Sequence, residues 1–180
     1  MSVNHSTTPI SPQFECAEYI ARVAWMAGFI DGDGYITISG QVRKNRPTRS
    51  YRVYVGVSNT KREALELFVQ YYGGAIYHVH ESRKGIDEKN WADAYNWYCP
   101  ISSSKRLLED VLPYLKIKTR QAALCLEFLR ERKNTKQWRR ANGQIGGSIG
   151  LDAEELRKRE AYRVAIQSLN AKGKLGRAAR

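Results

Sequence analysis

Hydrophobic and polar residues alternate along the chain with two different periods, which predict a helix followed by strands. Small residues recur every three or four positions from Ala17 to Gly32, which places them on one stripe of a helix. Gly32 and Gly34 end this helix, and its last turn carries Asp31 and Asp33. Because the stripe has almost no side-chain bulk, it would let a second helix approach closely.

A period of two follows the helix, as is typical of strands with one buried face. In Tyr35–Val42 the isoleucines and Val42 fall on one face, and in Tyr51–Ser58 three valines do the same. A basic turn that contains Pro47 joins the two segments. We predict a hairpin with one apolar and one polar face.

The elements that follow repeat this order. We expect a helix that Thr60 caps and that ends at Tyr72, before two glycines. Further strands and helices are predicted at Ala75–Ser82, Ala92–Ile101, Lys105–Leu112 and Thr119–Lys133. Two hairpins from such a repeat form one antiparallel sheet with helices on a single face. We therefore predict an α+β fold whose other sheet face is open to solvent or to a ligand.

Composition divides the chain into three parts. We predict a flexible leader at residues 1–14, a core at 15–133 and a basic C-terminal extension with one helix at 134–180. Within the extension, Asn142–Gly150 is rich in glycine and is expected to be flexible. Asp152 and Glu155 form a capping box, which predicts a helix that runs to about Ala171.

The chain is strongly basic, and the excess charge is concentrated in two places. Lys and Arg number 30 against 18 Asp and Glu, which gives a net charge of +12. From Arg130 onward there are 14 basic and 5 acidic residues. A second basic cluster lies between Gly34 and Arg62, in a stretch without any acidic residue. Such clusters suit a polyanion, so nucleic acid is the expected partner.

Other features of the sequence exclude several classes of protein. Three cysteines at widely separated positions show no spacing suited to zinc and are expected to be reduced. The sequence contains no signal peptide and no apolar run of membrane-spanning length. We expect a soluble intracellular protein that does not bind a membrane, while its compartment stays open.

The two aspartates at the end of the first helix have several interpretations. Helix-terminal carbonyls and the negative end of the helix dipole, next to Asp31 and Asp33, would attract a cation. The same residues could form a solvated turn or an incidental cap on a buried helix. An EF-hand is disfavoured, because Phe29 and Gly40 stand where its acidic ligands belong. The residues alone leave the choice open.

Two segments of the chain carry a resemblance to a known family. MAGFIDGDG, at residues 26–34, resembles the nine-residue signature of the LAGLIDADG homing endonucleases. LPYLKIKTRQA, at residues 112–122, resembles the family's segment with a basic residue before a later helix. The resemblance implies an αββαββα fold with a saddle-shaped sheet. Because the chain has one copy of the signature, it also implies a homodimer through the small stripe, at Ala21, Ala24, Gly28 and Gly32.

The resemblance also implies a catalytic site. Asp33, with the carbonyl of Gly32, would bind Mg²⁺, for which Mn²⁺ or Ca²⁺ could substitute in binding, and no small-molecule cofactor is implied. Lys118 would polarise solvent near the scissile phosphate. Asn59 stands where family members often carry Gln, an amide that orients the attacking water. A further basic residue would be Lys61 or Arg62. Asp31 is expected to cap its helix end or to bind backbone.

The predicted DNA-binding surface combines outward side chains of the sheet with nearby basic residues. Arg suits guanine and Gln suits adenine in the major groove. The residues are Thr37, Ser39, Gln41, Arg43, Lys44, Arg46, Arg49, Arg52, Tyr54, Ser58, His78, His80, Tyr95, Trp97, Lys116, Arg139 and Arg140.

The function expected from this resemblance is site-specific cleavage of double-stranded DNA. We predict metal-dependent double-strand breaks in a long, near-palindromic target, with short 3′ overhangs, that promote intron mobility. A maturase that assists RNA splicing and a regulator that binds without cutting use the same fold and are the alternatives. A Ca²⁺-binding interaction protein is a third possibility, which the absent EF-hand ligands oppose.

Overall fold

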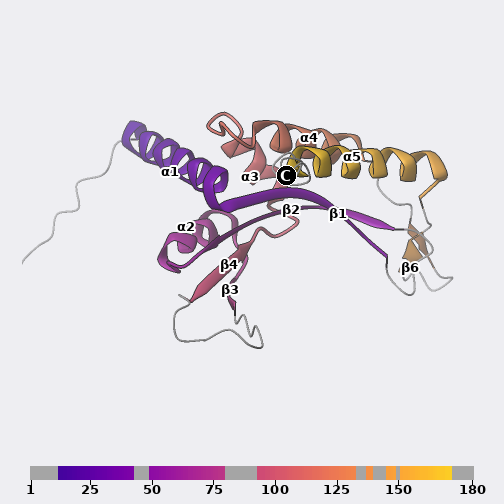
Figure 1. Ribbon diagram of the computed structural model, residues 1–180, viewed down its shortest axis with the longest axis horizontal. Coiled ribbons are helices and arrows are strands. Elements are labelled where there is room, and N and C mark those ends of the chain that lie inside the picture. The colour runs from indigo at the N-terminus through magenta and orange to yellow at the C-terminus, as the bar shows by residue number, and fades with distance from the viewer. Residues whose placement is uncertain are drawn as a thin grey trace, which may run out of the picture.

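The protein is built on a four-stranded antiparallel sheet that carries helices on one face (Figure 1). The computed structural model describes residues 12–42, 49–79, 93–132, 137–139, 145–148 and 151–171. The elements are α1 (Pro12–Asp33), β1 (Gly34–Gln41), β2 (Ser50–Asn59), α2 (Glu63–Tyr72), β3 (Ile76–Val79), β4 (Ala94–Tyr98), α3 (Ser104–Val111), α4 (Thr119–Glu131), β5 (Gln137–Arg139), β6 (Ile145–Ser148) and α5 (Ala153–Ala171). The main sheet has the order β1-β2-β4-β3, so the predicted α+β fold with two hairpins in one sheet is confirmed.

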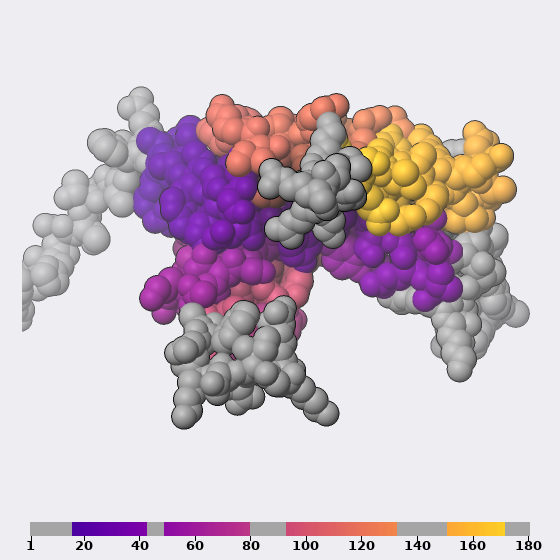
Figure 2. All heavy atoms as spheres, in the orientation of Figure 1, coloured from indigo at the N-terminus to yellow at the C-terminus, as the bar shows by residue number. Residues whose placement is uncertain are grey.

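The hydrophobic core lies between the sheet and the helices. Ile36 and Ile38 of β1, with Val53, Val55 and Val57 of β2, are all buried, as their alternation predicts. Helix α1 adds Met26 and Ile30 to this core, and both are fully buried. Within the described residues no helix covers the opposite face of the sheet, and the surface beneath β1 and β2 is hollowed (Figure 2).

Several boundaries differ from the prediction for local reasons. Val42 was expected on the buried face, but β1 ends at Gln41 and the Val42 side chain is 72% exposed. Helix α2 begins at Glu63 with Arg62 as its N-cap and without a side-chain cap, so Thr60 does not cap it. The predicted start of α5 at Asp152 is confirmed, because the Glu155 N–H donates to Asp152 Oδ1 at 2.7 Å, which is one of the two bonds of a capping box.

The C-terminal extension is more ordered than its composition suggests. Strands β5 and β6 pair as an antiparallel hairpin, and β6 lies inside the glycine-rich segment that was predicted to be flexible. Helix α5 packs on the core through Ile166, which is fully buried. Its Asn170 also donates from Nδ2 to the backbone oxygen of Ile36 in β1, at 3.2 Å. The extension therefore supports the sheet from the helical side.

In the part of the chain that the structure describes, no helix combines the length and the apolar character needed to span a bilayer.

Candidate active site

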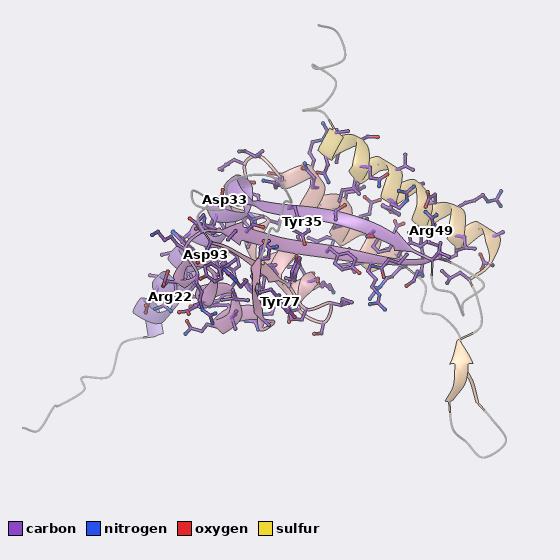
Figure 3. All side chains as sticks on the ribbon, turned by 60° about the horizontal axis from the view of Figure 1, so that its bottom comes forward. Arg22, Asp33, Tyr35, Arg49, Tyr77 and Asp93 are labelled. Atoms are coloured by element: carbon purple, nitrogen blue, oxygen red, sulfur yellow. The ribbon has the colours of Figure 1, made fainter. Side chains whose placement is uncertain are left out.

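Asp33 lies where the first helix meets the sheet. It is the last residue of α1, and β1 begins at the next residue, Gly34. A Cβ at Gly34 would be 2.8 Å from the Ile30 backbone and 3.2 Å from the Gly56 oxygen, so only glycine allows this close approach. The Asp33 carboxylate is exposed at this junction, as Figure 3 shows. A ligand on the open side can therefore reach it.

Asn59, the last residue of β2, holds this carboxylate in place. Its Nδ2 donates to Asp33 Oδ2 at 2.8 Å, and its Oδ1 accepts from the Lys61 backbone N–H at 2.8 Å. Both ends of the amide are therefore engaged. The contact brings together two residues that the sequence assigned to one site from positions far apart in the chain.

Asp31 has a structural role beneath the site. Its side chain is only 8% exposed and accepts three backbone hydrogen bonds, from Lys116 at 2.6 Å, Ile117 at 3.0 Å and Lys118 at 2.8 Å. Burial opposes ionisation of the carboxyl, but these three N–H groups and the nearby Lys118 charge outweigh it and lower the pKa of Asp31. The expectation that Asp31 binds backbone is confirmed.

Lys118 is distant in sequence from α1, but its side chain contacts the end of this helix. Its Nζ donates to the backbone oxygens of Ile30, at 2.9 Å, and of Asp31. Burial lowers the pKa of Lys118, while the negative charges of Asp31 and Asp33 oppose this shift. An ammonium carries three N–H donors, so one remains for solvent or for a ligand beside Asp33.

The two candidates for a further basic residue differ in their surroundings. Lys61 is tied to the site through its backbone bond to Asn59. Arg62 instead caps α2, and its Nε lies 3.5 Å from Glu66 Oε1 in an exposed ion pair. Lys61 is therefore connected to the Asp33 carboxylate through Asn59, whereas Arg62 bonds away from the site.

The residues at the end of α1 suit an oxygen-liganded cation only in part. Among the described residues, no group of three or more His, Cys, Asp or Glu could hold a metal ion. The exposed Asp33 carboxylate and the Gly32 carbonyl offer oxygen ligands of the type that Mg²⁺ and Ca²⁺ prefer. An ion here fits if further oxygen atoms come from water, from a phosphate or from a second chain.

The open face of the hairpin gathers most of the predicted DNA-binding side chains. Cross-strand register places Thr37 opposite Tyr54 and Ser39 opposite Arg52. These four side chains point away from the buried isoleucines and valines and are partly exposed, and Ser58 extends their face toward the site. Gln41 lies at the far end of this face, opposite Ser50. Lys116 is exposed in the segment before α4, where its backbone N–H binds Asp31.

The prediction was wrong for β4. Trp97 is fully buried opposite Val57, packs on Phe68, and donates from Nε1 to the Gly73 oxygen at 2.9 Å. A side chain in the core cannot contact a base. In the pairing of β3 with β4, His78 lies opposite Tyr95, and Ile76 lies opposite Trp97. Side chains two residues apart on a strand share a face, so Tyr95 and His78 lie on the helical side as well.

The strands β3 and β4 place other residues on the open face. These are the neighbours in sequence of the mispredicted ones, namely Tyr77, Asn96 and Tyr98. Alternation alone could not find them, because aromatic residues occupy both faces of β4. The signal would have been a pairing that puts Trp97 opposite the buried Val57.

Arg49 also departs from the prediction. It lies directly before β2, two residues from the buried Tyr51, and its Nη1 lies 3.9 Å from Glu160 Oε2 of α5. Its side chain therefore lies against the helical layer and not on the open face. Arg139 lies in β5. The remaining predicted DNA contacts are outside the described residues, namely Arg43, Lys44, Arg46, His80 and Arg140.

The stripe of small residues on α1 is open. Ala21, Gly28 and Gly32 are exposed, Ala24 is half-buried, and a Cβ built at either glycine would meet nothing within 4 Å. Trp25, which is 45% exposed, stands beside the stripe. The result is a flat surface with an apolar flank.

Comparisons with known proteins agree with this architecture. No protein-family model matches the chain. It is 31% identical over 120 residues to DNA endonuclease I-CvuI of Chlorella vulgaris, which covers 64% of this chain and 68% of that protein. The structure resembles that of I-CvuI in complex with its target in the presence of Ca, with a TM-score of 0.63, 23% identity, and coverage of 85% of this chain and 84% of that chain.

A second solved structure has the same fold at lower identity. It is the archaeal intron-encoded homing endonuclease I-Vdi141I complexed with DNA, with a TM-score of 0.59, 12% identity, and coverage of 83% of this chain and 84% of that chain. The sequence relationship, the signature at the end of α1 and the shared fold lead to one assignment. The chain belongs to the LAGLIDADG homing endonuclease family.

Proposed function

We propose that this protein is a site-specific DNA endonuclease that makes metal-dependent double-strand breaks in a long, near-palindromic target. The breaks would leave short 3′ overhangs and promote intron mobility. The observation that carries this proposal is the exposed Asp33 carboxylate, which Asn59 holds at the edge of an open sheet face. A maturase or a non-cleaving regulator of the same fold would have no need for a carboxylate held in this way.

Duplex DNA suits the open face in shape and chemistry. The β1–β2 hairpin is a two-stranded ribbon, and the major groove admits such a ribbon. Its outward side chains include Thr37, Ser39, Gln41, Arg52, Tyr54 and Ser58. The hydroxyl, amide and guanidinium groups among them can donate to or accept from base edges. The relatives I-CvuI and I-Vdi141I were both crystallised with DNA.

Asp33 and Gly32 would hold a divalent cation, and we propose Mg²⁺ as the active ion. The relative I-CvuI was crystallised with DNA in the presence of Mg and of Ca. A bound divalent cation neutralises phosphate charge and makes water a better nucleophile. We assign Asn59 the positioning of Asp33, since both ends of its amide are engaged. The remaining N–H of Lys118, supported by Lys61, would stabilise the charge that develops on the phosphate.

A homodimer would complete the site. Each chain contributes one Asp33, while a double-strand break needs one cut in each strand. The flat stripe on α1, with Trp25 at its side, offers a surface on which a second copy could pack its own α1. Light scattering should give twice the chain mass of 20.6 kDa. A mass of one chain at working concentration would contradict the dimer.

The proposed nuclease is tested by cleavage of a randomised duplex library in Mg²⁺. We expect discrete double-strand cuts that Asp33→Asn abolishes, because the substitution removes the ligand charge. Binding of the selected target in Ca²⁺ should persist in this variant. The matched control is Asp152→Asn, since asparagine is an equally good cap for α5. Binding by the wild type without any cuts would overturn the proposal in favour of a maturase or a regulator.

A further inference from the structure

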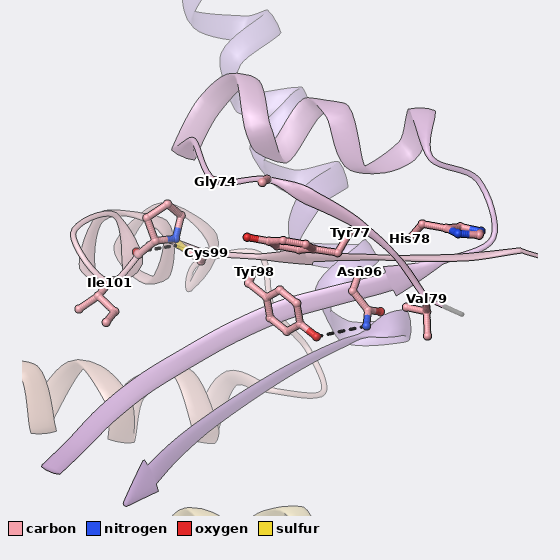
Figure 4. Close-up of a pocket in the computed structure, with 10 residues that line it drawn as sticks. Gly74, Tyr77, His78, Val79, Asn96, Tyr98, Cys99 and Ile101 are labelled. Atoms are coloured by element: carbon pink, nitrogen blue, oxygen red, sulfur yellow. Dashed lines mark hydrogen bonds between the residues drawn. The ribbon is translucent and has the colours of Figure 1, made fainter. Parts of the chain in front are cut away.

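The open face carries an unassigned groove beside the candidate active site. The groove has a volume of about 750 Å³ and runs along β3, β4 and the segments next to them (Figure 4). Tyr77, Asn96 and Tyr98 line it. At one end, a Cβ on Gly74 would be 2.7 Å from the backbone oxygen of Tyr98, so glycine allows the chain before β3 to lie against β4. The packing of the backbone therefore shapes this end of the groove.

Cross-strand register connects the groove to the catalytic residues. One row of opposed residues is Ser58, Asn96 and Tyr77, and Ser58 directly precedes Asn59. The next row is Tyr35, Gly56 and Tyr98, and Tyr35 follows Asp33 by two positions. Tyr35 covers Gly56, where a Cβ would lie 2.7 Å from its hydroxyl oxygen. A duplex whose scissile phosphate meets Asp33 would therefore pass over these two rows.

Hydrogen bonds within the rows orient one hydroxyl. Ser58 Oγ donates to Asn96 Oδ1, and Asn96 Nδ2 donates to the Tyr98 hydroxyl oxygen at 3.2 Å. Because this oxygen accepts the bond, the hydroxyl hydrogen is left to donate elsewhere. Tyr98 is 41% exposed, and its ring lies 5.8 Å from the more exposed ring of Tyr77.

The chemistry of the two rows differs from that of a phosphate-binding surface. None of their six residues is charged, whereas Arg52 lies farther along the hairpin. A neutral surface with aromatic rings and one oriented donor matches base edges better than it matches the anionic backbone. Acceptors such as purine N7 and thymine O4 are available in the major groove.

We propose that Tyr98, oriented by Asn96 and Ser58, is a specificity-determining residue that donates a hydrogen bond to a base-edge acceptor next to the cut. Tyr77 and Tyr35 flank it and contact the apolar parts of neighbouring bases, such as a thymine methyl. This inference rests on the proposed endonuclease function. It adds a direct reading of base pairs near the scissile phosphate, by side chains of β3 and β4 other than those that the sequence indicated.

The test compares cleavage profiles of Tyr98→Phe and the wild type on the randomised duplex library. Phenylalanine keeps the ring and loses only the donor. We expect the preference at one base pair near the cut to fall about 3- to 10-fold, with outer positions unchanged. Asn96→Ala should relax the same position, because the hydroxyl loses its orienting partner. Tyr162→Phe, which makes the same change on the helical side, is the control.

Three outcomes separate this inference from the function on which it rests. An unchanged profile for both Tyr98→Phe and Asn96→Ala, with cutting still abolished by Asp33→Asn, would overturn the inference alone. An equal loss of preference at every position would also overturn it, because such a loss indicates a merely structural role. Failure of the wild type to cut would overturn the proposed function itself.

Discussion

The two ends of the β1–β2 hairpin are held in different ways. At the near end, next to Asp33, most contacts join a side chain to backbone groups: three N–H groups bind the Asp31 carboxylate, and two carbonyls accept from Lys118 Nζ. At the far end, side chains make them, between the hairpin and α5. Figure 3 shows both ends, with Asp33 and Tyr35 at one and Arg49 at the other.

The far end is organised around the missing side chain of Gly40. A Cβ there would lie 2.7 Å from Arg49, 3.1 Å from Tyr51 and 3.2 Å from Arg163 of α5. The Tyr51 hydroxyl donates to Glu160 at 2.8 Å, and Arg163 Nε donates to the same carboxylate at 2.9 Å. Helix α5 thus clamps the hairpin through groups that are partly exposed to water.

This difference indicates which end tolerates change. A buried carboxylate that loses its charge leaves several N–H groups poorly satisfied, which is costly. An ion pair in contact with solvent contributes little, since water replaces it readily. The near end should therefore be rigid and sensitive to substitution, while the far end should adapt to different targets.

The largest effect should come from Lys118→Gln at the near end. Glutamine can still donate to a carbonyl of α1, but it brings no positive charge to the phosphate. We expect the cleavage rate of the selected target to fall about 10²- to 10³-fold, with target binding in Ca²⁺ nearly unchanged. Lys105→Gln on α3 is the control for a lysine on the helical side. A cleavage rate that stays within about twofold of the wild-type rate would contradict a catalytic role for Lys118.

A smaller effect on stability should follow from Asp31→Asn. We expect the free energy of unfolding to fall by about 2–3 kcal/mol, because an amide accepts fewer and weaker hydrogen bonds from the three N–H groups. Since the pKa of Asp31 is lowered in the folded chain, its stabilisation is complete above the ordinary value of 3.8 and is lost as pH falls through the lower, folded value.

Urea denaturation of Asp31→Asn and the wild type at neutral and acidic pH measures this. The two unfolding free energies should converge as the wild-type carboxyl becomes protonated. A gap that stays constant over this range would show that the charge of Asp31 does not stabilise the near end.

The smallest effect is expected for Glu160→Gln at the far end. Hydrogen bonds from Arg163 and Tyr51 lower the pKa of Glu160 to about 2 from its ordinary value of 4.5. Its contribution to stability is therefore present above pH 4.5 and is lost as pH falls toward about 2. Because the group is exposed to solvent, we expect a loss below about 1 kcal/mol at neutral pH.

The same variant should change the reading of the target more than the stability. With the clamp weakened, the cleavage profile should relax at outer base pairs, by about 2- to 3-fold, and stay unchanged near the cut. Glu154→Gln, on the first turn of the same helix, is the control. Relaxation near the cut instead would contradict the independence of the two ends.

The near end could largely be read from the sequence. The glycines and the alternating strands indicated the helix and the hairpin because each pattern is local, whereas the role of Asp33 was implied by the family resemblance and stays a prediction. The prediction that Asp31 binds backbone was also correct, but its partners at Lys116 to Lys118 could not be derived from periodicity, since long-range folding brings them there.

The far end and β4 depended on information that local patterns lack. The open face of β4 follows from the pairing of Trp97 with Val57, and a shift by one residue would reverse it. Arg49 appeared to be a DNA contact because of its charge, but it packs against Gly40 and pairs with the Glu160 carboxylate of α5, which places it on the helical side. Both errors concern which face a side chain takes once distant segments have paired.

The direct junction between α1 and β1 has one more consequence. Because Asp33 ends the helix and Gly34 begins the strand, no loop separates the proposed cutting residue from the proposed reading strand. The spacing between the recognised base pairs and the cleavage point would then be fixed by the fold. An extra base pair inserted between the recognised sequence and the cleavage point should leave the duplex uncut instead of moving the break. New targets would be gained by substituting the side chains of β1 that contact bases, while the distance from these side chains to Asp33 stays constant.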